Sequence, residues 1–190
     1  MKYILLFLCI LSLSCKYNVA NPVGTLKDYT AGSGKIYYVS SGAEVPEIVE
    51  TLRKNKHSLG KYLIKVDATN DTTDAKTNIL TNIASALTNN PSFNNVEVDI
   101  SKLTGIKEIP KEIFKDLKNL SSIILSDEVT KIEKEAFAGC SSLTNVRFSK
   151  ELTNIGNGAF SNCSDLTFIS LDSEQKLTIS SNAFDGCSSL

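Results

Sequence analysis

Apolar side chains recur at fixed intervals along the second half of the chain. Segments that begin at Phe114, Phe137, Phe160 and Phe184 read FKDLKNLSSIIL, FAGCSSLTNVRF, FSNCSDLTFISL and FDGCSSL, and their starts lie 23, 23 and 24 residues apart. In every segment a leucine follows the phenylalanine after six residues, and an isoleucine precedes it by five. One such unit is too short to bury its own apolar side chains, so the period predicts a solenoid in which neighbouring units cover one another.

Each unit contains a short alternating stretch, which predicts a strand. In the first unit Leu120, Ile123 and Leu125 give the pattern L-x-x-I-x-L, a bend followed by a stretch of period two. Two apolar side chains then point into the coil, and the residues between them face outward. We expect the segment I-x-x-x-A-F before each turn to form a helical turn or a short 3₁₀ piece on the outer side, where alanine allows the backbones to approach closely.

The combined pattern I-x-x-x-A-F-x-x-C-x-x-L-x-x-V-x-F resembles the BspA-type leucine-rich repeat over residues 92–190. The resemblance implies an α/β fold class, namely a leucine-rich repeat solenoid with a parallel sheet of short strands. It also implies a function, since members of that family are commonly surface proteins that bind other proteins, and several of them are adhesins.

The last repeat is incomplete, because Leu190 comes seven residues into it, before its strand begins. The strand that contains Phe168 to Asp172 would then be an open edge of the sheet. We therefore expect either that the chain is a fragment of a longer repeat protein or that this edge pairs with another copy or with a partner.

Residues 36–91 alternate between strand-like and helix-like patterns and predict an amino-terminal α/β cap. Strands are expected at 36–39, 62–66 and 96–100, with one helix from Pro46 to about Gly60 and another that stops at Asn89-Asn90-Pro91. This β-α-β-α-β order indicates parallel strands joined by right-handed crossovers. Such a cap would continue the repeat sheet and shield the first coil from water.

The amino terminus is typical of an exported protein. An apolar run follows Lys2 and ends at Leu13; at about 10 residues it is shorter than the roughly 20 that a membrane-spanning helix needs, so we predict a signal peptide at residues 1–14. The sequence LSLSC, which ends at Cys15, resembles the lipobox of bacterial lipoproteins. That resemblance implies a lipid on Cys15. A secreted protein without lipid, cut near Ala20, is the open alternative.

The segment from Cys15 to residue 35 has no helical or strand periodicity, and we expect it to be a flexible tether. A flexible chain of this length spans about 25 Å root-mean-square. The folded part would therefore stand clear of the membrane surface. The predicted location is the bacterial outer membrane or cell surface, with the membrane as a partner through the lipid anchor.

Composition narrows the function further. The chain has 190 residues, 42% of them apolar, and this length predicts one domain. A net charge of −1 leaves no basic surface for nucleic acid. One histidine and five cysteines are little material for a catalytic triad or a zinc site. Because Leu117 occupies the column of Cys140, Cys163 and Cys187, that column is expected to be a core position. We expect no catalytic residue, no metal and no cofactor.

Binding is expected on the concave side of the sheet, through strand residues that alternate with the buried ones. Ile124, Arg147 and Phe168 are side chains of the kinds that anchor protein interfaces. Scattered surface apolar residues without a role are the open alternative. The candidate residues on this side are Glu97, Asp99, Ile124, Asn145, Arg147, Phe168, Ser170 and Asp172.

Taken together, the sequence predicts a non-enzymatic, lipid-anchored surface protein that binds a protein ligand, with adhesion as one form of that role. The ligand would be host extracellular matrix or another surface protein, and self-association through the open edge is a further expectation. The alternative is a structural or assembly lipoprotein of the periplasm or envelope, in which the repeats serve as spacers.

Overall fold

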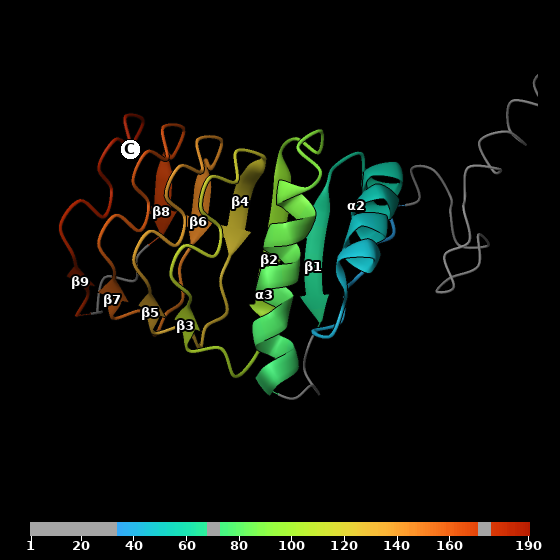
Figure 1. Cartoon of the computed structure of the whole chain (residues 1–190), viewed down its shortest axis with the longest axis horizontal. Helices are drawn as coiled ribbons and strands as arrows, with labels where there is room; N and C mark the ends of the chain where they lie inside the picture. The colour runs from blue at the N-terminus through green and yellow to red at the C-terminus, as the bar shows by residue number, and fades with distance from the viewer. Residues whose placement is uncertain (1–33, 68–72, 171–175) are drawn as a thin grey trace, which may run out of the picture.

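The computed structural model describes residues 34–67, 73–170 and 176–190, and Figure 1 shows their coils side by side along the long axis. The predicted signal peptide, Cys15 and nearly all of the tether lie outside the described residues. Among the residues described, no helix is both long and apolar enough to cross a membrane.

The cap follows the predicted order of helices and strands, with one exception. Helix α2 (Val45–Leu59) begins with a proline in its first turn and ends at Gly60, whose φ of 76° closes the helix. Strand β1 (Leu63–Asp67), helix α3 (Thr73–Thr88) and strand β2 (Val96–Lys102) follow. The residues before α2 form only a single parallel bridge, between Val39 and Val66, where we expected a strand.

The buried side chain of Asn55 explains why residues 36–39 do not form a longer strand. Its amide group donates to the carbonyl of Tyr37 at 2.9 Å and to that of Leu63 at 2.8 Å. Its Oδ1 accepts from the backbone N–H of Tyr37 at 2.8 Å. Because this side chain on α2 satisfies the backbone groups of Tyr37, they are not needed for a ladder with β1.

One parallel sheet runs through the cap and the repeats without a break. Its strands β4 (Leu120–Ile124), β6 (Asn145–Arg147) and β8 (Phe168–Ser170) stand 23 residues apart in the register, and the full order is β1-β2-β4-β6-β8. Strand β2 therefore joins the cap to the first coil, and the predicted class of an α/β leucine-rich repeat solenoid with a parallel sheet and an α/β cap is confirmed.

A second parallel sheet, which we did not expect, lies on the outer side next to the expected turns. It consists of the two-residue strands β3 (Glu108–Ile109), β5 (Lys131–Ile132), β7 (Asn154–Ile155) and β9 (Thr178–Ile179). The alanine–phenylalanine segments that follow are turns, and their bonds also run between coils, as from Phe114 N–H to the Ala136 carbonyl at 2.9 Å. The turns also hold bonds between residues three apart, as from Ala136 N–H to the Glu133 carbonyl at 3.3 Å, so they are single turns of the 3₁₀ type and do not extend into helices.

The repeat phenylalanines stack in file through the middle of the solenoid, as the period predicts. The ring centroids of Phe114 and Phe137 lie 5.3 Å apart, those of Phe137 and Phe160 5.0 Å, and those of Phe160 and Phe184 5.3 Å. The first three leucines of the leucine column are buried with them, since Leu120, Leu143 and Leu166 have no exposed surface, whereas Leu190 is exposed. Neighbouring coils thus share one apolar interior.

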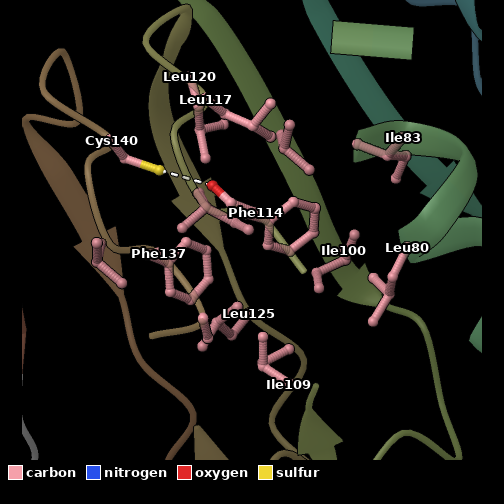
Figure 2. Close-up of a cluster of buried hydrophobic side chains, with 14 of the residues drawn as sticks. Leu80, Ile83, Ile100, Ile109, Phe114, Leu117, Leu120, Leu125, Phe137 and Cys140 are labelled. Atoms are coloured by element: carbon pink, nitrogen blue, oxygen red, sulfur yellow. Dashed lines mark hydrogen bonds between the residues drawn. The ribbon is translucent and has the colours of Figure 1, made fainter. Parts of the chain in front are cut away.

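Helix α3 covers the first coil. Figure 2 shows Leu80 and Ile83 of this helix beside Ile100 of β2 and facing the ring of Phe114. All four side chains are buried in one continuous core. The helix takes the place that an outer turn of a preceding repeat would occupy, and so keeps water from the first phenylalanine of the stack.

At one turn position in each coil the backbone is left-handed, and every second residue at this position is a glycine. Asp116, Gly139, Asn162 and Gly186 all have φ between 59° and 75°. A Cβ on Gly139 would lie 2.2 Å from Oδ1 of Asp116, and one on Gly186 would lie 2.6 Å from Oδ1 of Asn162. Each of the two polar side chains therefore rests on the bare backbone of the following coil.

The cysteine column is part of the core, as Leu117 predicted, and its residues are thiols. Each thiol donates to the carbonyl of a phenylalanine in the preceding coil: Cys140 to Phe114 at 2.9 Å (Figure 2), Cys163 to Phe137 at 3.2 Å and Cys187 to Phe160 at 3.1 Å. Burial raises the pKa of Cys140 strongly, that of Cys163 to about 12, and that of the half-buried Cys187 as well. These thiols are therefore protonated at neutral pH.

We expect the thiols to differ in reactivity according to their exposure. In native protein at pH 8, iodoacetamide should alkylate Cys187 much faster than Cys140 or Cys163, because the thiolate is the nucleophile and only Cys187 is partly accessible. Peptide mass spectrometry after brief labelling measures this, and labelling in denaturant serves as the control in which all three react. Equal labelling of Cys140 and Cys187 in the native protein would contradict the buried column.

Candidate protein-binding face

The outward side of the five-stranded sheet, called here the sheet face, consists of two rows of side chains set by the strand register. Parallel pairing places residues of equal offset next to one another. The first row is Leu63, Glu97, Ser122, Asn145 and Phe168. The second row is Lys65, Asp99, Ile124, Arg147 and Ser170. Seven of the eight predicted binding residues lie in these rows, and Asp172 lies outside the described residues.

Two lysines of the cap belong to this surface and were missed by the sequence reasoning. Lys61 pairs with Glu97 at 2.6 Å, and Lys65 pairs with Asp99 at 2.9 Å. The signal was present, because Tyr62, Ile64 and Val66 alternate as buried positions and the residues between them must face the other way. These pairs neutralise the charge of the sheet face on its cap side.

Asp99 corrects the expectation of an exposed residue, because only 12% of its side chain is accessible. Lys65 of β1 reaches across it, and Ser101 donates to its Oδ1 through both its hydroxyl, at 2.6 Å, and its backbone N–H, at 3.0 Å. Burial acts to raise the pKa of Asp99, but the hydrogen bonds from Ser101 and Lys65 outweigh it and lower the pKa below 3.8. The hydrogen bond between Lys65 and Asp99 also raises the pKa of Lys65.

Replacing Lys65 with methionine should destabilise the fold by about 1 to 3 kcal/mol, because it leaves the Asp99 carboxylate buried without its cation. The native pKa of Asp99 is lowered, so its contribution is present above pH 3.8 and is lost as the pH falls through the lower native value. The variant should therefore lose less stability than the wild type on acidification below pH 3.8. Urea unfolding at several pH values measures both effects.

The matched control for this change is Lys107→Met. Lys107 pairs with Glu128 at 3.2 Å, but 63% of its side chain is exposed. Its loss should cost about 0.5 kcal/mol or less. If both variants lost the same free energy of unfolding, the burial of Asp99 would contribute nothing to the strength of its ion pair.

The repeat side of the sheet face is more open. Asn145, Arg147 and Ser170 are exposed, and Phe168 is 57% exposed, the most of any large apolar residue among those described. Ile124 is half-buried, which corrects the expectation that it is fully exposed. The guanidinium of Arg147 stands 3.8 Å from Oδ1 of Asp127 on the turn after β4, which is too long for a hydrogen bond.

The sheet face includes residue types that are common in protein interfaces. In the described ranges 34–67, 73–170 and 176–190, no three His, Cys, Asp or Glu side chains gather as metal ligands would. The sheet face has an aliphatic side chain, a guanidinium and an aromatic ring on three neighbouring strands, β4, β6 and β8. Rigid strands hold such groups at a fixed spacing.

A family model described as "BspA type Leucine rich repeat region (6 copies)" matches residues 107–190. Residues 107–190 are thus similar to BspA-type leucine-rich repeats. The match begins one residue before β3 and contains β4, β6 and β8 of the sheet face. No curated protein and no solved structure matches the chain.

BspA-type repeats occur in bacterial surface proteins, and leucine-rich repeat solenoids generally mediate protein interactions. A repeat solenoid of this kind is typically a non-enzymatic scaffold. The match to such repeats at residues 107–190 suggests a protein-interaction repeat protein, in agreement with the expected class of function.

Proposed function

We propose that the chain is a lipid-anchored protein of the bacterial cell surface, which binds another protein through the sheet face in an adhesive role. The observation that supports this most is the exposed end of the sheet face, where Phe168, Arg147 and Asn145 stand on adjacent strands with no element of the described chain over them. Aromatic and arginine side chains are the residue types that most often dominate the energy of protein interfaces.

The sheet face alone is small for a strong interaction. A standard interface uses about 20 to 30 residues from each partner, whereas the two rows contain ten side chains, of which Leu63 and Asp99 are buried. Many copies held on one cell surface would act together and raise the apparent affinity without further contacts. A lipid on Cys15 would provide that density, so anchoring and binding support one another.

A binding screen tests the role of the sheet face. The purified chain is measured against a panel of extracellular-matrix and bacterial surface proteins, together with an Arg147→Ala/Phe168→Ala variant. Every partner of the wild type should bind the double variant at least tenfold more weakly, since each anchor is worth about 2 kcal/mol. A Lys118→Ala variant, changed at an exposed turn outside the rows, is the control and should bind normally. Undiminished binding by the double variant would exclude the sheet face.

Two measurements test anchoring and orientation. Mass spectrometry of the mature protein should find Cys15 as its first residue, carrying acyl chains. External protease on intact cells should remove the protein if it is displayed on the surface. Survival of the protein under protease would favour the alternative of a periplasmic or envelope role, and a mature chain that begins near Ala20 without acyl mass would exclude the lipid anchor.

A further inference from the structure

The three cations of the sheet face differ in how fully they are paired. Lys61 and Lys65 contact carboxylates of the neighbouring strand at 2.6 and 2.9 Å. Among the residues that the structure describes, Arg147 has only Asp127, at 3.8 Å, and 51% of its side chain is exposed. An arginine has five N–H donors in a planar fork. Arg147 is thus the one cation of these three whose hydrogen-bonding capacity is open to a partner.

The two residues paired with Arg147 in the sheet register carry no charge. In its row it stands between Ile124 on β4 and Ser170 on β8. In the other row Asn145 lies beside the exposed ring of Phe168. Ile124 and the ring of Phe168 therefore supply apolar surface near the guanidinium, and a charge-assisted hydrogen bond gains strength where such surface excludes water.

We propose that the sheet face recognises a carboxylate on an extended segment of its protein partner, bound by Arg147, with an apolar side chain of the same segment on Phe168. This inference rests on the proposed function and names the chemistry of the partner. The incoming carboxylate takes the place of Asp127, whose own carboxylate is 54% exposed and too far away to hold the guanidinium by a hydrogen bond.

The spacing of the two anchors fits an extended peptide. Arg147 and Phe168 stand on adjacent strands and two positions apart in register, since Asn145 pairs with Phe168 and Arg147 with Ser170. Diagonal neighbours of this kind are roughly 7 to 8 Å apart. Side chains two residues apart on an extended segment are separated by roughly 6.5 Å. The partner would therefore present an aspartate or glutamate two positions from an aliphatic or aromatic residue.

The test uses two peptide arrays with the purified full chain. One array holds hexapeptides with leucine or phenylalanine two positions from a glutamate and the other positions varied, and the second replaces the glutamate with glutamine. The wild type should retain glutamate peptides at least tenfold better than their glutamine partners, and less so at high salt. Arg147→Gln should abolish this preference, whereas Lys118→Gln should leave it unchanged.

Asp127→Asn gives the sharpest result. It removes the carboxylate that competes for Arg147, so it should strengthen the retention of glutamate peptides several-fold and leave glutamine peptides unaffected. The inference would be overturned if the wild type bound glutamate and glutamine peptides equally well, or bound neither. It would also be overturned if Asp127→Asn bound glutamate peptides no better than the wild type does. The proposed function has a separate readout. If the Arg147→Ala/Phe168→Ala variant loses the partners found in the screen while the arrays show no carboxylate preference, only the carboxylate inference fails.

Discussion

Replacing Phe137 with alanine is expected to destabilise the protein by about 3 to 5 kcal/mol, the largest effect of any single change considered for this chain. Phe137 has no exposed surface and stacks on a ring at each side, at 5.3 and 5.0 Å. Removing it leaves a cavity between two coils, and the coils cannot close over it because their backbones are tied by the strand pairs β4–β6 and β5–β7. Urea unfolding followed by circular dichroism measures the loss.

Phe184→Ala is the comparison for this change. Phe184 stacks only on Phe160 and is half-buried, so its loss should cost less than half as much. Phe168→Ala, on the surface, should change stability by about 0.5 kcal/mol or less. If all three variants unfolded at the same urea concentration as the wild type, the stack would have no part in holding the coils together.

The second large effect is expected for Gly156→Ala, at about 2 to 3 kcal/mol. A Cβ at this position would lie 2.7 Å from the backbone nitrogen of Lys134, 2.8 Å from the carbonyl carbon of Glu133 and 2.9 Å from the carbonyl oxygen of Ile132. All three are backbone atoms of the preceding coil, so no side chain can turn aside to make room. The third coil must move away from the second, which weakens the bond from Gly156 N–H to the Ile132 carbonyl at 2.8 Å.

Gly42→Ala is the matched control, since a Cβ there meets no atom within 4 Å. It should leave stability unchanged or raise it slightly by restricting the unfolded chain. Thermal unfolding of both variants by calorimetry separates the two cases. A Gly156→Ala protein as stable as Gly42→Ala would mean that the coils are not packed as closely as these distances require.

The solenoid could be predicted from the sequence because large apolar residues recur at the same positions in every repeat. The columns of Phe114 and Leu120 repeat with hardly a change, and each column has a single physical role, burial against the next coil. The cap helices were predictable for a similar reason, since Pro46 marks a beginning and Gly60 an end.

Features that depend on bonds between coils could not be predicted in this way. The outer sheet of β3, β5, β7 and β9 consists of two-residue strands, too short to show an alternating pattern. The burial of Asp99 depends on Lys65, which lies 34 positions earlier and meets it only through the pairing of β1 with β2. The candidate residues of the sheet face were found because their offset from the buried columns is fixed, but exposure and pairing required the register.

The alternating corners of the solenoid bear on how such a chain can grow or shrink during evolution. Asp116 and Asn162 each lie against a glycine in the coil that follows, Gly139 and Gly186. Deleting one coil would bring two bulky polar corners together or leave two glycines adjacent, whereas deleting or duplicating a pair of coils would preserve the match. We therefore expect insertions and deletions in this array to involve two repeats at a time, although each single repeat packs on its neighbours in the same way.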